Sequence, residues 1–142
     1  MGPGVTMTAP STALRLQVEA ALAVVPEVAA GDWSIANTAL DAVQPPVFIL
    51  EWGPDPWRQI KTMCVDDLQM EVIAVSARLN PEGNMPLLEA MVDGAIAALY
   101  AARLRPYQTL GPGPLEVGNI QYLAARVQLR RPVEIGAANA GD

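Results

Sequence analysis

The sequence predicts an α+β fold: a mixed or antiparallel β-sheet of about four strands with two α-helices packed on it. Three observations carry this prediction. Residues 12–25 and residues 85–105 have apolar side chains at helical spacing, and each segment stops at a proline. Residues 46–52 form a short apolar run behind two prolines. Two later segments alternate with the period of a β-strand, which completes the sheet.

The 142 residues fit one domain, expected over residues 11–135, between a flexible arm at residues 1–10 and a flexible tail at residues 136–142. Ser11 or Thr12 supplies a hydroxyl that can cap the first helix. The buried stripe of that helix is expected to hold Leu14, Val18, Ala21, Leu22 and Val25, and Pro26 ends it.

The segment after the first helix is ambiguous over residues 27–44, where Trp33 and Ile35 suggest a short strand. PVFILEW at residues 46–52 predicts a strand with apolar side chains on both faces, which is typical of a strand covered on both sides. GPDP at residues 53–56 predicts a turn, because proline fixes φ and glycine allows conformations that other residues avoid.

The two alternating segments are expected to bury one face each. In residues 64–78 an apolar set alternates with a second set, so one face should be buried and the other partly wet: Leu68, Met70, Val72 and Ala74 against Gln69, Glu71, Ile73 and Val75. The last strand, about 120–131, alternates again, with Leu123, Ala125, Val127 and Leu129 inward and Tyr122, Arg126 and Gln128 outward.

The second helix follows a loop in which Asn84 can act as its cap, and Pro106 stops it. Its expected core stripe is Leu88, Met91, Val92, Ala95, Leu99 and Ala102. Another face lacks large side chains and lets a second backbone approach closely, through Ala90, Gly94, Ala97, Ala98 and Ala101. That neighbour is either the first helix or the sheet of the same chain, or a neighbouring subunit. Residues 106–119 then predict a long loop, rich in proline and glycine.

Catalysis has little support in the composition. The chain has no histidine and a single cysteine, Cys64, which removes the commonest general base, the Ser–His and Cys–His pairs and the usual zinc sites. The lone cysteine cannot form an intrachain disulfide, so a reducing compartment is expected. A net charge of −6 argues against a surface that grips phosphate backbones. We therefore expect no catalytic residue, no metal and no cofactor.

The remaining carboxylates have structural explanations. Asp66 and Asp67 are adjacent on a predicted strand and point to opposite faces, so they cannot converge as an acid–base pair. Asp55 lies between two prolines and can bond the amides of its own turn. A small histidine-free hydrolase built on Asp66 or Asp55 stays an alternative, as does a nucleic-acid-binding module, although the nine Lys and Arg residues are scattered.

An interaction surface is the better-supported kind of site. Two tryptophans on one stiff turn are typical of an interface anchor, and the prolines lower the ordering cost of association. The paired arginines at the end of the last strand either protect the sheet edge or contact an acidic partner. The candidate interface residues are Trp52, Trp57 and Arg58 at the turn, Gly94 in the helix, Gly111, Pro112, Gly113 and Pro114 in the long loop, and Arg130 and Arg131.

The order of these segments is distinctive. An amphipathic helix precedes PPVFILEWGPDPW, then come CVDDLQMEVIAVSAR, an alanine-rich helix and GNIQYLAARVQLRRPVEI. Over roughly residues 12–135 this order resembles the tail terminator (tail completion) proteins of long-tailed, siphovirus-type phages of actinobacteria. Two departures are visible: Met63 precedes Cys64 where the family often has glycine, and residues 27–44 match no part of the pattern.

The resemblance implies a compact domain with two helices on a sheet, and a structural role in the virion. Such proteins form a homohexameric ring on the last ring of the tail tube, stop its polymerisation and join the tail to the head connector. The implied partners are further copies of the chain, the major tail tube protein and the connector or stopper protein. Genomic DNA passes through the ring without sequence-specific binding, and no membrane is involved. Assembly takes place in the cytoplasm of the host bacterium, and the closest alternative is a connector or stopper protein of the same neck.

Overall fold

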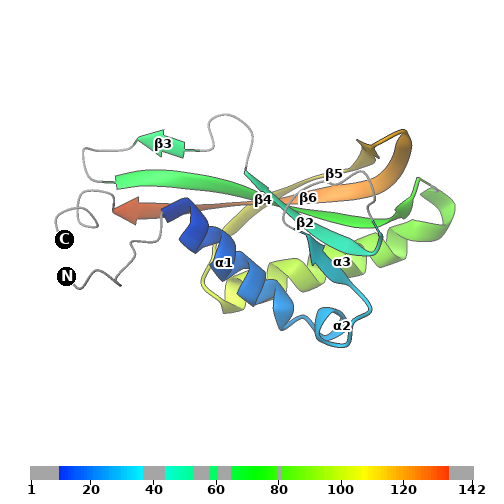
Figure 1. The fold of residues 1–142 in the computed structure, drawn as a ribbon, viewed down its shortest axis with the longest axis horizontal. Helices are drawn as coiled ribbons and strands as arrows, with labels where there is room; N and C mark the ends of the chain where they lie inside the picture. The colour runs from blue at the N-terminus through cyan, green and yellow to red at the C-terminus, as the bar shows by residue number, and fades with distance from the viewer. Residues whose placement is uncertain (1–9, 37–43, 53–57, 61–64, 80, 135–142) are drawn as a thin grey trace.

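The computed structural model of the chain describes residues 10–36, 44–52, 58–60, 65–79 and 81–134 (Figure 1). These residues form one mixed β-sheet and three helices, so the predicted α+β class is confirmed, with more strands than the four expected. In chain order the elements are α1 (Pro10–Ala23), α2 (Pro26–Ala29), β1 (Ser34–Ala36), β2 (Val47–Trp52), β3 (Arg58–Ile60), β4 (Val65–Arg78), α3 (Pro81–Ala101), β5 (Pro106–Val117) and β6 (Ile120–Glu134).

The sheet has the strand order β1-β2-β4-β6-β5, and β3 also pairs with β4. β1 runs parallel to β2, and the other pairs are antiparallel. β2 and β3 lie along the same side of β4, because β6 is paired along its other side. On the shared side Trp52 is opposite Met70 and Arg58 is opposite Leu68. Only Gln69 of β4 stands between those two pairs, so the edge is interrupted there. The predicted turn at residues 53–56, like Trp57, falls outside the described residues.

The helices all lie on one side of the sheet, where the larger core forms (Figure 1). The expected buried stripe of the first helix is confirmed, since Leu14, Val18, Ala21, Leu22 and Val25 are all buried. Phe48 of β2 lies at the centre of this core and meets Trp33 edge-on, with ring centroids 5.9 Å apart. Trp33 directly precedes β1, and the short strand suspected around Trp33 and Ile35 is present.

The opposite face of the sheet is buried as well, which the alternation did not predict. Ile73 and Val75 of β4, expected on a partly wet face, are fully buried, and Tyr122 and Gln128, expected outward on β6, are only 3 % exposed. The cause is a second apolar cluster, which joins these strands to β2 and to the hairpin end of β5 and β6: Val47, Ile49, Ile73, Val75, Val117, Tyr122 and Ala124. In Figure 1 that hairpin end curls away from the helices.

Helix α3 begins at Pro81, four residues earlier than predicted, so Asn84 is inside the helix and is not its cap. Of the expected core stripe, Leu88, Met91, Ala95 and Leu99 are buried, Val92 is half-buried and Ala102 is exposed. The helix ends four residues before Arg105, because Arg103 takes the left-handed conformation with φ of 62°. The amide of Leu104 donates to the carbonyl of Leu99 and the amide of Arg103 to that of Tyr100, which is a Schellman motif.

The prediction of a long loop over residues 106–119 is wrong. Residues Pro106–Val117 form edge strand β5, and only Gly118 and Asn119 turn the chain into β6. Gly118 has φ of 63°, as the first position of a tight hairpin turn requires. Proline is tolerated in this strand because it lies at the edge of the sheet. The register shifts between Leu110 and Gly113, where Gly111 has φ of 97° and the Gly111–Pro112 peptide is cis.

Candidate functional site

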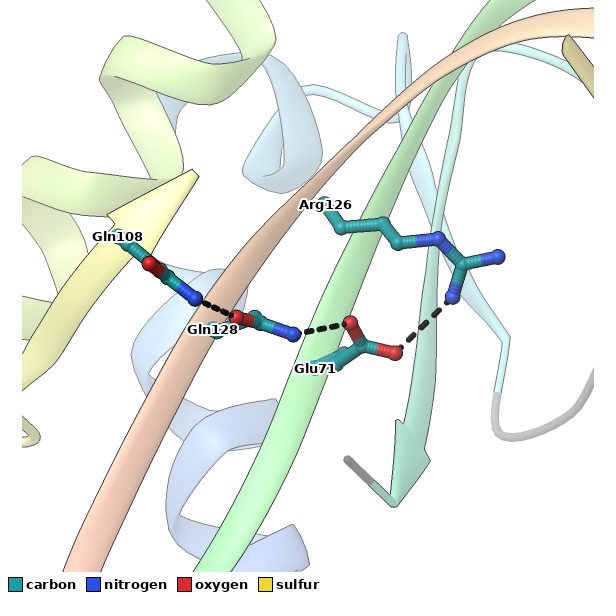
Figure 2. Close-up of polar contacts among 4 residues, drawn as sticks. All are labelled: Glu71, Gln108, Arg126 and Gln128. Carbon is teal, nitrogen blue, oxygen red and sulfur yellow. Dashed lines mark hydrogen bonds and ion pairs between the residues drawn. The ribbon is translucent and has the colours of Figure 1, made fainter. Parts of the chain in front are cut away.

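A polar network crosses the sheet on the face opposite the helices (Figure 2). The strand register places Glu71 of β4 opposite Gln128 of β6, and Gln128 opposite Gln108 of β5. Arg126 Nη1 donates to Glu71 Oε1 at 2.9 Å, and Gln128 Nε2 donates to Glu71 Oε2 at 2.8 Å. Gln108 Nε2 donates in turn to Gln128 Oε1. Three neighbouring strands are therefore joined by side chains at one level.

This network is suited to a structural task. The side chain of Glu71 is 6 % exposed, and both of its oxygens accept hydrogen bonds, one from a cation. A one-residue slip of β4 against β6 would bury Glu71 among the apolar side chains of the helix face, so the network specifies the register. Glu51 of β2 is opposite Glu71 on the other side. Sequence reasoning missed the network, because Glu71 and Gln128 are 57 residues apart in the chain.

Two of the turn residues are brought close together by the register. Trp52 ends β2 and Arg58 begins β3, on either side of Gln69 along the same edge of β4. Trp57 lies outside the described residues. The interface roles predicted for Trp52, Trp57 and Arg58 stay predictions.

The two arginines at the end of the last strand do not act together, because neighbouring strand residues point to opposite faces. Arg130 is exposed and lies over the ring of Tyr107, with its guanidinium carbon 4.8 Å from the ring centroid. Arg131 is half-buried on the other face and lines a groove between α1 and α3. A contact with an acidic partner can therefore use one of them at a time.

The small-residue face of α3 divides into two parts. A Cβ added at Gly94 would lie 3.5 Å from Val25 Cγ1, so the backbone of α3 approaches its own chain there. Ala98 is buried, whereas Ala90, Ala97 and Ala101 are exposed. Gly94 therefore packs against its own chain, as one of the two alternatives for this face expected. The exposed alanines leave the rest of the face open to a partner.

The residues expected in the long loop line the edge of the sheet on β5. Gly111, Pro112 and Pro114 are exposed, and Gly113 is half-buried. Gly111 and Pro112 border a hollow of about 210 Å³ between β5 and the first half of α3. The exposed side chains of Tyr107 and Leu110 on the same strand add apolar surface. These residues form an exposed strand at the edge of the sheet and not a loop, and they stay accessible to a partner.

The carboxylates considered for catalysis lie on β4 or outside the described residues. Asp66 and Asp67 are opposite Val133 and Pro132 in the β4–β6 pair, and Asp55 lies outside the described residues. Within the parts of the chain that the structure describes, no three Cys, Asp or Glu residues are grouped so that they could hold a metal ion. Among the helices described, none is long and apolar enough to cross a membrane. In comparisons with known proteins, the chain matches no family model and no curated sequence.

Proposed function

We propose that this chain is a structural protein of a phage virion, which forms a ring on the end of the tail tube, stops its polymerisation and joins the tail to the head connector. The observation that carries the proposal is the order of elements. The segments that resemble tail terminator proteins become α1, β2, β4, α3 and β6, with both long helices on one face of the sheet. That arrangement is the fold the resemblance implies.

Exposed apolar side chains support a role in assembly. Leu16 and Val24 of α1 are 55 % and 70 % exposed, and Tyr100 of α3 is 61 % exposed. Tyr107 and Leu110 are exposed on β5. Both long helices and the edge strand therefore carry apolar side chains that a partner could cover.

The proposed partners follow from the same role: further copies of the chain, the major tail tube protein and the head–tail connector or stopper protein. Genomic DNA passes through the ring, and the net charge of −6 suits a bore that repels the DNA backbone. A bore lined with arginine would contradict that last point. The protein acts in the tail or neck of the virion after assembly in the host cytoplasm.

The test is to inactivate the gene in the phage that carries it and to measure the tails by electron microscopy. If the protein is a terminator, its loss should give overlong tails of variable length, because tube growth then continues past the normal length. Tails of normal length that fail to join heads would instead assign the chain to the connector or stopper proteins. Particles of normal form would contradict both roles.

A further inference from the structure

The second half of α3 and the facing side of α1 form an open groove of about 570 Å³. Most of the side chains that line it are alanines, including Ala20 and Ala21 of α1 and Ala98 and Ala101 of α3, and Gln17 and Val24 of α1 line it as well. Arg103, directly after α3, and Arg131 of β6 line the same groove. The alanines let another backbone come close, and the two guanidinium groups give the groove a positive charge.

The residues that line the groove do not neutralise its positive charge. None of the residues that line the groove is acidic, and α3 carries no charged residue from Gly94 to its end. Among the described residues, Arg103 and Arg131 have no ion pair. Arg131 is half-buried, and a partly desolvated cation gains more from an anionic partner than one in free solution.

The backbone at Arg103 points to the same use. Arg103 has φ of 62°, a conformation in which residues other than glycine are uncommon and which glycine adopts readily. Glycine is the usual residue at this position of a Schellman motif. An arginine there costs stability, so its side chain is expected to serve something outside the helix.

A complementary acidic surface lies near the other end of the same helix. Glu89 and Asp93 are exposed, one helical turn apart on α3, and they border the hollow between α3 and β5. Like charges at this spacing repel each other weakly. Exposed small residues, Ala90 and Ala97, lie beside them on the helix. The charge of this surface is therefore opposite to that of the groove. Its small side chains also allow the two surfaces to approach each other closely.

We propose that the groove of one subunit binds the Glu89–Asp93 surface of the next copy of the chain, so that Arg103 and Arg131 contact these two acids. The proposal rests on the ring-forming function and names its subunit contact. The two surfaces are different, so the contact is head-to-tail, and such contacts produce closed rings or open filaments. The contact weakens as salt concentration rises, because the charges lie at an open surface.

Two variants with opposite charge changes test the contact. Arg103→Glu with Arg131→Glu reverses the groove, and Glu89→Arg with Asp93→Arg reverses the acidic surface. Each variant alone meets like charge, so its assembly should weaken by about tenfold or more. An equimolar mixture pairs every reversed surface with its complement. Native mass spectrometry should then show assembly restored, with the two variants in equal number.

Controls separate the contact from folding and from general charge effects. Arg105→Glu with Glu116→Arg changes two exposed charges outside the groove and should assemble as the wild type does. Arg131→Gln, a milder change, should weaken assembly and leave the melting temperature of the domain within a few degrees. Circular dichroism establishes that each variant is folded before it is mixed.

Three results would overturn the subunit contact: single reversals that assemble normally, a mixture that does not recover, and a wild-type chain that stays monomeric at about 100 µM. A fourth is binding of the groove to the tail tube protein in place of a second copy. None of these results decides whether the protein terminates tails, because tail length after gene inactivation is measured independently.

Discussion

Replacing Glu71 with leucine is expected to destabilise the domain by about 2–3 kcal/mol. Leucine is close to glutamate in size but accepts no hydrogen bond, so Gln128 Nε2 loses its acceptor at a site that is 3 % exposed. A buried donor left without a partner costs about 1–3 kcal/mol. Arg126 is 37 % exposed and can turn to water, so its lost ion pair adds less than about 1 kcal/mol.

Graded variants isolate the source of the loss. Glu71→Gln keeps a side chain that can bond both neighbours: its amide oxygen accepts from Arg126, and its amide nitrogen donates to Gln128 once Gln128 reverses its own amide. The exposed Gln108 can reverse in turn, so this variant should cost about 1 kcal/mol. Gln128→Leu combined with Glu71→Leu removes donor and acceptor together, so the pair should cost less than the sum of the two single changes. Glu116→Gln, at an exposed position of β5, is the control and should change stability by less than about 0.5 kcal/mol.

The assay is thermal unfolding followed by circular dichroism at one fixed protein concentration. For a chain of this size each kcal/mol corresponds to about 3–4 °C, so Glu71→Leu should melt roughly 6–12 °C below the wild type. An unchanged or higher melting temperature for Glu71→Leu would refute the reasoning. Simple additivity of the two leucine substitutions would show that the Glu71–Gln128 bond does not couple β4 to β6.

Three further changes concern backbone positions. Gly111→Ala should lower the free energy of unfolding, measured by urea titration, by about 2 kcal/mol, because φ is 97° and the new Cβ would lie 3.2 Å from a backbone oxygen of β6. Gly113→Ala is the control, since a Cβ there has open space and the substitution should be nearly neutral. Gly94→Ala should stabilise by about 0.5–1 kcal/mol, because its Cβ would make an ordinary 3.5 Å contact and alanine favours helix; a loss of stability would contradict the described packing. Arg103→Gly should raise the melting temperature while weakening subunit assembly, and a gain in both would contradict the role given to its side chain.

Much of the fold was predictable because local pattern and tertiary position agree. The β2 run is apolar at every position from Val47 to Leu50, and all four side chains are buried between two layers. The stripe of α1 repeats at helical spacing and packs as expected. In these two elements the local pattern of apolar residues predicts both the secondary structure and the buried side chains, and contacts with distant segments do not alter either.

The errors come from features set by distant partners. β5 contains glycine and three prolines, the composition of a loop, yet pairing with β6 makes it a strand whose irregularities are absorbed by bulges. Ile73 and Val75 looked partly wet because their cover comes from the β5–β6 hairpin. The end of α3 was placed too late because an arginine, and not glycine, has the left-handed conformation.

The candidate site was less predictable than the fold. Arg131 was identified from its place at the end of a strand, but its partner in the groove, Arg103, was not. The groove depends on how α1 and α3 lie together, and the polar network on the register of three strands. Neither arrangement leaves a motif in the sequence.

The proposed capping of the tail tube is tested most directly by adding purified protein to tube protein as it polymerises. Electron microscopy should show tubes that become shorter as more protein is added, with extra density at one end. Glu71→Gln, which keeps the fold, should behave as the wild type. Tubes of unchanged length with bare ends at every protein concentration would contradict the claim.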